Sequence, residues 1–293
     1  MRVTFNTQFN NGIYDLEAAA TRLAEWQRQV SSQKRIDAPS DDPSAAAAVI
    51  LENSQMATLD QYEETTDSVE ARLKVADTFL SDLITNLTHA QTTAAAGRST
   101  ILKAEQREAL ALEMRSVRDA ILQDFNVQYR GQYLFSGTAS LTAPFAKDGA
   151  GVVQPYAGND SVQRLDIDRN RTVPVTLDGG AVAGNLFDAL DSLATAIESG
   201  DGAQMDAGIA DLNAAFRRAT TAQSSVGATL SDLDANRIRL DSERRASLER
   251  RSSLEDTNLA EAASRMQAAD TAYRAALAAV STNARLSLMD YLR

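Results

Sequence analysis

The chain has 293 residues, of which 44% are hydrophobic but only 5% aromatic, and its net charge at pH 7 is −11. This charge argues against a nucleic-acid binder, which would present a basic face, and the absence of cysteine excludes disulfides, thiolate metal sites and cysteine nucleophiles. The small apolar side chains, together with only 14 glycines and 5 prolines, favour long helices packed in slender bundles.

The beginning of the chain lacks the continuous apolar core of a secretory signal peptide. No stretch reaches the roughly 18 apolar residues of a membrane span. We therefore expect no membrane insertion, and a protein that is cytosolic or leaves the cell by a route without a cleaved signal.

The first predicted element is an amphipathic helix over residues 5–30, because its apolar residues step by three and four positions. This spacing forms the coiled-coil seam, the face that one helix buries against another. The stripe consists of Phe5, Phe9, Gly12, Leu16, Ala19, Leu23, Trp26 and Val30.

A turn-rich segment is predicted over residues 31–43. Pro39 and Pro43 disfavour helical backbone in the residues that precede them, so the helix must end in this segment. Asp41 or Asp42 then offers an N-cap for the next helix, with Pro43 near its first position.

A long helix is predicted to run from this turn to about residue 95, a length of roughly 75 Å. Its seam alternates steps of three and four throughout: Leu59, Tyr62, Thr66, Val69, Leu73, Ala76, Leu80, Leu83, Leu87, Ala90 and Ala94. A third helix is predicted over residues 103–130.

Glycine and proline then become frequent, and residues 132–185 are predicted to be a small β-rich insertion. Two short alternating runs, 164–168 and 172–177, predict strands bounded by turns. Pro174 in the second run argues for an edge position, because proline cannot donate a ladder hydrogen bond.

Helical spacing returns at Leu186, in a short helix that should stop at Gly200. A second long helix is predicted over 203–251, where Gln223 and Arg237 fall on the seam and could fix its register. The last predicted helix covers 257–289. Its apolar stripe and the residues that continue it are Leu259, Ala262, Met266, Ala269, Tyr273, Ala276, Val280, Ala284, Leu288 and Leu292.

The elements follow a mirror order: terminal helix, long helix, β insertion, long helix, terminal helix. We expect a mainly α fold, a long antiparallel coiled-coil or helical-bundle rod with paired terminal helices and a small β-rich inserted domain. Three domains are predicted: a terminal coiled coil from 1–43 with 252–293, a rod from 44–131 with 186–251, and the outer insertion 132–185.

The sequence contains no combination of residues typical of an enzyme active site. The single histidine, His89, lies within a long helix and is interpreted as a surface or seam-edge residue, and no nucleophile motif accompanies it. Asp166 and Asp168 share one face of a predicted strand, which we interpret as solvated. We predict no enzyme activity, no metal and no cofactor.

The turn segment carries a family resemblance. Ser31–Arg35 followed by Pro39–Pro43 resembles the S-x-G-K-R…P-S-D-D-P turn of the flagellin superfamily, and its P-S-D-D-P form is similar to the family of flagellar hook-filament junction proteins. Gln33 stands where this family usually has glycine, which would suit a left-handed helix cap. Further similar segments are Gly131–Thr138, Pro144–Phe145, Tyr156–Gly158, Asn185–Leu190, Tyr273–Leu277 and Ser287–Leu292.

The resemblance implies a structural protein exported unfolded through the flagellar type III apparatus, cytoplasmic before export and extracellular afterwards. It implies a ring of identical subunits between a hook-side junction protein and flagellin, with the terminal helices forming an inner tube, and a cytosolic export chaperone as an earlier partner. The expected assembly residues are Phe5, Phe9, Leu16, Leu23, Trp26, Leu259, Met266, Tyr273, Val280, Leu288 and Leu292. The turn-motif residues are Lys34, Arg35, Pro39, Ser40, Asp41, Asp42 and Pro43.

Two alternatives stay open. A filament flagellin would have similar ends, but segments 131–138 and 185–190 favour the junction family. A cytosolic coiled-coil scaffold would explain the seams but not the motifs. Each assembly residue could also be buried within the chain's own helix pair.

Overall fold

The computed structural model describes the backbone of residues 5–149 and 151–291 and the side chains of residues 10–149 and 151–282. This part of the chain is mainly α, as predicted from the sequence. The contacts divide the chain into two compact units, Met1–Leu59 with Ser242–Arg293 and Asp60–Asp241. The predicted division into three domains remains a prediction.

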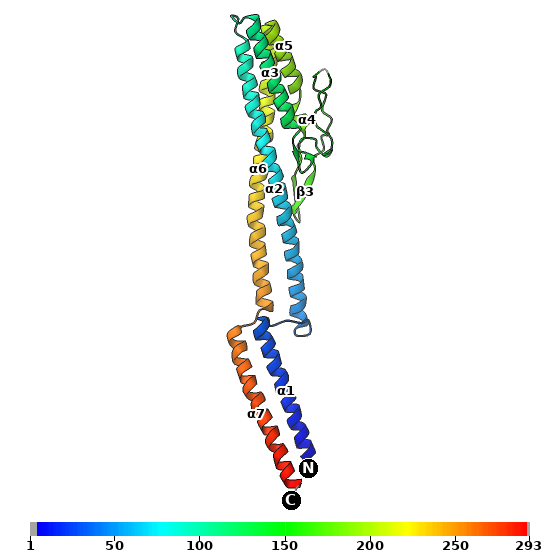
Figure 1. Cartoon of the computed structure of the whole chain (residues 1–293), viewed down its shortest axis with the longest axis vertical. Coiled ribbons are helices and arrows are strands. Elements are labelled where there is room, and N and C mark those ends of the chain that lie inside the picture. Colours follow the sequence, from blue (N-terminus) through cyan, green and yellow to red (C-terminus); the bar gives the residue numbers. More distant parts are fainter. Residues whose placement is uncertain (1–4, 150, 292–293) are drawn as a thin grey trace. The chain divides into compact units, whose positions relative to one another are not determined.

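The unit Asp60–Asp241 is built on two long helices, α2 (Pro43–Gly97) and α6 (Gly202–Glu255), each of which also contributes residues to the other unit. Figure 1 shows them side by side, with α3 (Ala104–Phe125) and α5 (Leu186–Ser199) packed against each other beside them. The expected seam of α2 is confirmed as its buried face. Ten of its eleven residues are buried, and Tyr62 is half-buried.

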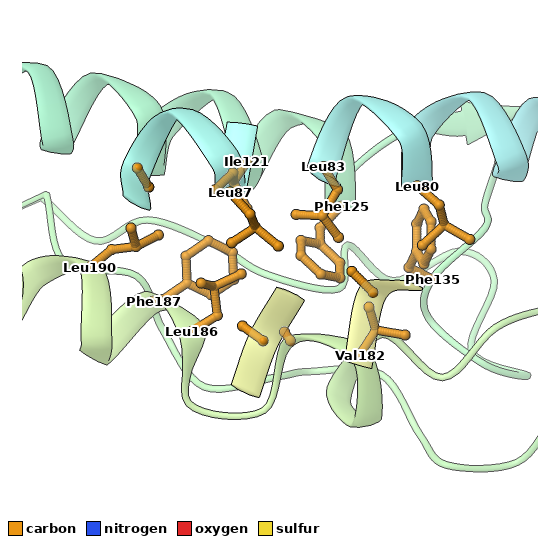
Figure 2. Packing of buried hydrophobic residues seen from close by; sticks show 14 of the residues in the cluster. Leu80, Leu83, Leu87, Ile121, Phe125, Phe135, Val182, Leu186, Phe187 and Leu190 are labelled. Atoms are coloured by element: carbon orange, nitrogen blue, oxygen red, sulfur yellow. The ribbon is translucent and has the colours of Figure 1, made fainter. Parts of the chain in front are cut away.

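The core of this unit gathers side chains from the helices and from the insertion. Figure 2 shows Leu87 of α2 beside Leu186 and Phe187 of α5, and Leu80 of α2 beside Phe135 of the insertion. Phe125 lies at the centre, with the rings of Phe135 and Phe187 edge-on at centroid distances of 5.5 and 5.9 Å. Such edge-to-face pairs add to the free energy gained by removing apolar area from water.

The first hairpin of the insertion begins earlier than predicted, because α3 ends at Phe125 rather than near residue 130. Strands β1 (Gln128–Tyr129) and β2 (Gln132–Tyr133) pair antiparallel around a tight turn. Its central residues Arg130 and Gly131 have φ angles of 50° and 78°. Positive φ at both positions matches the twist of a two-residue hairpin.

The second hairpin pairs β3 (Arg164–Asp168) with β4 (Arg171–Pro174), with a bulge between Asp166 and Asp168. The first predicted strand matches β3, whereas β4 is shorter than predicted and has Pro174 opposite Arg164 at its end. Each sheet has two strands, so Pro174 lies on an edge strand as expected. A short helix that the sequence did not predict, α4 (Gly179–Ala183), follows.

Asn236 fixes the second hairpin to α6. Its side chain is fully buried and its Nδ2 donates a hydrogen bond to the Ile167 carbonyl at 3.0 Å. Arg239 pairs with Asp168 at the same end of the hairpin. The seam residue expected to be buried here, Arg237, is instead half exposed, because the hairpin covers the neighbouring position.

Candidate assembly surface

The two terminal helices pair with each other. Helix α1 (Phe5–Ser32) lies beside α7 (Leu259–Tyr291), with the start of α1 and the end of α7 at the same end of the pair (Figure 1). Both helices arise from the apolar three-and-four spacing, which gives each of them a single apolar stripe. Within the chain, the apolar stripe of each terminal helix packs against the other terminal helix.

This pair covers its own seam poorly. In the described side chains of α1 and α7, only Gln29 and Ala262 are buried, whereas Leu80 and Leu87 of α2 are completely buried. Two helices alone enclose an apolar stripe from one side only, so its flanks stay in contact with water. The terminal pair therefore keeps apolar surface available for a further partner.

Two large side chains of α7 make this open surface explicit. Leu277 is 48% exposed and Leu259 44%. Single exposed apolar residues are normal on protein surfaces. Here Leu259 belongs to the half-buried stripe and Leu277 borders it, so both extend an apolar surface that is already incomplete.

Close contacts nevertheless set how α1 and α7 meet. A Cβ atom on Gly12 would lie 3.2 Å from Cγ2 of Val280, so the absent side chain lets the two helices approach closely. Near the other end of the pair, the guanidinium of Arg265 lies 5.1 Å from the ring centroid of Trp26, a cation–π contact.

The turn-motif segment forms a hydrogen-bonded loop between α1 and α2. Oδ2 of Asp41 accepts hydrogen bonds from the backbone N–H groups of Asp37 and Ala38 at 3.1 and 3.0 Å. Asp42 is the N-cap of α2, because its Oδ1 accepts from the Ala45 N–H at 3.1 Å. This outcome confirms one of the two expected caps and places Pro43 at the first helical position.

These hydrogen bonds stabilise the ionised carboxyl groups. The backbone N–H groups of Ala38 and then Asp37 lower the pKa of Asp41, and the Ala45 N–H followed by the Ser44 hydroxyl lowers the pKa of Asp42. Hydrogen bonds that favour the charged form act in this direction. The turn is therefore most stable when both carboxyl groups are ionised.

The basic half of the motif binds the end of α6. The Arg35 backbone N–H donates to the Glu255 carbonyl at 2.7 Å, and its Nη2 donates to the Leu254 carbonyl at 2.7 Å. Nζ of Lys34 lies 2.5 Å from Oε1 of Glu255. The motif thus joins the turn after α1 to the segment that leads into α7.

Gln33 occupies the left-handed region with a φ of 60°. Its carbonyl accepts a hydrogen bond from the Thr257 backbone N–H at 3.0 Å, so the unusual conformation is held by the segment before α7. Glycine adopts this region without the steric cost that other residues meet. The backbone therefore keeps a glycine-like turn although the side chain is glutamine.

The structure distributes the expected assembly residues as follows. Leu16, Leu23, Trp26, Met266, Tyr273 and Val280 are half-buried, and Leu259 is exposed. The side chains of Phe5, Phe9 and Leu288, and the whole of Leu292, lie outside the described residues. That these residues contact neighbouring subunits stays a prediction.

Sequence reasoning missed two buried polar residues on α6 and one exposed apolar pair on α2. Asn236 and Ser247 are fully buried on α6, while Ile50 and Leu51 of α2 are 64% and 69% exposed. A seam pattern alone does not show which loop will cover a polar position. The segment from Pro43 to Leu59 contains one charged residue, Glu52, which was a usable sign of an apolar surface.

The described residues show no arrangement typical of a metal site. No three His, Asp or Glu side chains in this part of the chain lie where they could hold a metal ion. His89 lies on the surface, with Nε2 2.9 Å from Oε1 of Glu113. No described helix combines the length and apolar character needed to cross a membrane.

Comparison with known proteins gives one consistent result. Residues 5–140 match the bacterial flagellin N-terminal helical region. Flagellar hook-associated protein 3 of Escherichia coli is 26% identical over 185 residues, and that of Salmonella typhimurium is 26% identical over 187 residues. Each alignment covers 62% of this chain and 56% of the relative, so the chain matches little more than half the length of these curated relatives.

Solved structures share the fold. A putative flagellar hook-associated protein from Vibrio parahaemolyticus has a TM-score of 0.69 at 21% identity, covering 74% of this chain and 100% of that one. The flagellar junction protein FlgL from Legionella pneumophila has a TM-score of 0.61 at 14% identity, covering 71% and 100%. FlgL from Bacillus cereus has a TM-score of 0.61 at 16% identity, covering 69% and 99%.

Proposed function

We propose that this chain is a structural subunit of the flagellar hook-filament junction. Its residues 5–140 match the bacterial flagellin N-terminal helical region, and the chain is similar to flagellar hook-associated protein 3 of two bacteria. In this role it forms a ring of identical subunits between a hook-side junction protein and flagellin. The observation that carries the proposal is the half-covered seam of α1 and α7.

Helix–helix assembly would complete this seam. Half-buried residues such as Leu23 and Met266 have apolar surface left to cover, and neighbouring subunits that offer the same stripe would cover it. Burying apolar surface gains about 25 cal/mol per Å², so each side chain completed in this way stabilises the assembly. Folding of the terminal pair is then coupled to assembly, because the pair is weakest before neighbours cover it.

The motif turn supports this role by linking the terminal pair to the long helices. Arg35 and Lys34 bind the end of α6, and Asp42 caps the start of α2, so both connections of the pair are held in one hydrogen-bonded cluster. A subunit whose terminal helices carry the assembly contacts needs such a fixed attachment.

We further infer from the family resemblance that the chain is exported by the flagellar type III apparatus and ends in the extracellular flagellum. Before export, a cytosolic flagellar chaperone would hold the C-terminal amphipathic helix. The role is mechanical, with no catalytic step, no cofactor and no nucleic acid partner.

The test replaces half-buried seam residues by charge. Leu23→Glu and Met266→Glu, each in the full chain, are expressed in a strain that lacks the chain's own gene, and isolated flagella are probed for the protein. Leu141→Glu, at an 81% exposed position in the insertion, is the matched control. We expect both seam variants to be missing from flagella and the control to be present.

Helix content and urea denaturation of the purified variants separate assembly from folding, because the unit Asp60–Asp241 does not contain either residue. Deleting residues 257–293 should likewise abolish incorporation. Normal incorporation of the seam variants would refute the proposal. Long filaments formed by the purified wild-type protein alone would instead favour a filament flagellin.

A further inference from the structure

A groove on the unit Asp60–Asp241 has no role in the contacts described so far. It has a volume of about 530 Å³ and lies between α4 and α6. Apart from two arginines, its lining is formed by Ala181, Val182, Ala214, Thr221, Ala222 and Ser225. The small side chains leave space for one large aliphatic side chain from outside.

The two arginines of the groove differ in what they bind. Arg218 is committed to the fold, since its Nη2 donates to the Ala183 carbonyl at 2.7 Å and its Nε to the Val182 carbonyl at 3.2 Å. Arg217 is exposed, and within the part of the chain that the structure describes its guanidinium forms no ion pair. The groove therefore presents one free positive charge beside an apolar floor.

The chain carries a surface of complementary character on α3. Leu112 is 64% exposed, and Glu108 and Glu105 lie four and seven positions before it, on the same face of the helix. Among the described residues neither glutamate has an ion-pair partner. Two other exposed aliphatic residues have basic neighbours: Ile101 lies between Arg98 and Lys103, and Ile238 lies between Arg237 and Arg239.

We propose that Leu112 of one copy of this chain inserts into the α4–α6 groove of a second copy, with Glu108 of the first copy facing Arg217 of the second. Charge complementarity selects this occupant: the groove needs an aliphatic side chain flanked by negative charge, and α3 presents one. Because the two surfaces differ, the contact is head-to-tail, the type that builds rings or helical arrays. The inference rests on the proposed function and specifies one lateral contact in the assembly.

Cross-linking tests this contact directly, because the chain has no cysteine of its own. Full-length Leu112→Cys and Thr221→Cys chains are expressed together, and their flagella are treated with a short bismaleimide. We expect a covalent dimer that contains one chain of each kind. Leu141→Cys with Thr221→Cys is the control: Leu141 is an 81% exposed aliphatic residue outside α3, so its cysteine is more accessible than that at position 112 and should still give no dimer.

Charge exchange supplies a second measurement. Glu108→Arg and Arg217→Glu should each lower the yield of the Leu112–Thr221 cross-link about tenfold, because like charges then face each other. The chain with both substitutions should recover most of the yield. Thermal unfolding of each purified variant checks that the fold is intact.

The outcomes are separable. If the protein is present in flagella but gives no cross-link between the two kinds of chain, or if the double charge exchange recovers nothing, the lateral contact is refuted and the proposed function stands. If Thr221→Cys links only to another protein, the groove has a different occupant and this inference is wrong. If the protein is absent from flagella, both the lateral contact and the proposed function are refuted.

Discussion

Replacing Gln33 by glycine should stabilise the unit that contains the terminal helices. Gln33 has a φ of 60°, where a residue with a Cβ pays roughly 1–2 kcal/mol relative to glycine. Glycine in turn costs roughly 0.5–1 kcal/mol more backbone entropy on folding. The net expectation for Gln33→Gly is a gain of about 0–1.5 kcal/mol in the free energy of unfolding, with a midpoint of about 0.75 kcal/mol.

Urea denaturation followed by tryptophan fluorescence measures this change, because the only tryptophan of the chain, Trp26, lies in α1. Gln33→Ala is the control: it removes the exposed side chain but keeps the Cβ, so its stability should stay within about 0.5 kcal/mol of wild type. If the Gln33→Gly protein is no more stable than the Gln33→Ala protein, the argument from φ is refuted.

Two further predictions concern the long helix α6 and the turn. Asn236→Ala should destabilise the unit Asp60–Asp241 by about 1–3 kcal/mol, because the buried Ile167 carbonyl loses its hydrogen-bond donor. The control Ile238→Ala, at a 73% exposed position, should cost under about 0.5 kcal/mol. Equal urea midpoints for the two variants would contradict this prediction. Acid should open the 37–45 turn: the folded pKa values of Asp41 and Asp42 lie below the ordinary value of 3.8, so their contribution is present above that pH and is lost as the pH falls through the folded values. Limited proteolysis at the turn during an acid titration would detect the loss. In the double variant Asp41→Asn, Asp42→Asn, the rate of cleavage should depend less on pH between about pH 5 and pH 2. An unchanged pH dependence of cleavage would exclude these carboxyl groups as its cause.

The long helices were predictable because a single rule governs them. Every residue of the expected α2 seam from Val69 to Ala94 is buried, because two packed helices bury residues at the same spacing along their whole length. The cap at Asp42 was also foreseeable, because a side-chain acceptor followed by proline is a local signal. Such features depend on residues close in sequence.

The insertion was harder to predict because its contacts are non-local. The Arg130–Gly131 turn places an arginine at positive φ, a conformation that is uncommon for residues other than glycine. Burial of Asn236 instead of Arg237 depends on a hairpin that begins some seventy positions earlier in the chain. The spacing of apolar residues around Arg130 and Asn236 does not show which distant segment will pack against them.

For the candidate assembly surface, the sequence identified which helices carry the apolar stripes but not how far they cover each other. Residues such as Leu16 and Tyr273 were expected to contact either neighbours or the chain's own helix pair. The structure shows partial burial within the chain, which leaves room for both. The exposure of Leu277 beside the seam emerges only once the two helices are placed together.

The contact between Gly12 and Val280 joins the two extremes of the sequence, and this has a consequence for the order of folding. Because a polypeptide is made from its N-terminus, α1 leaves the ribosome long before its partner helix exists. Contacts between such distant residues also form slowly, since the loop between them must close first. Helix α1 therefore stays without its partner while α2 to α6 are made, and the terminal pair forms only after those helices have left the ribosome.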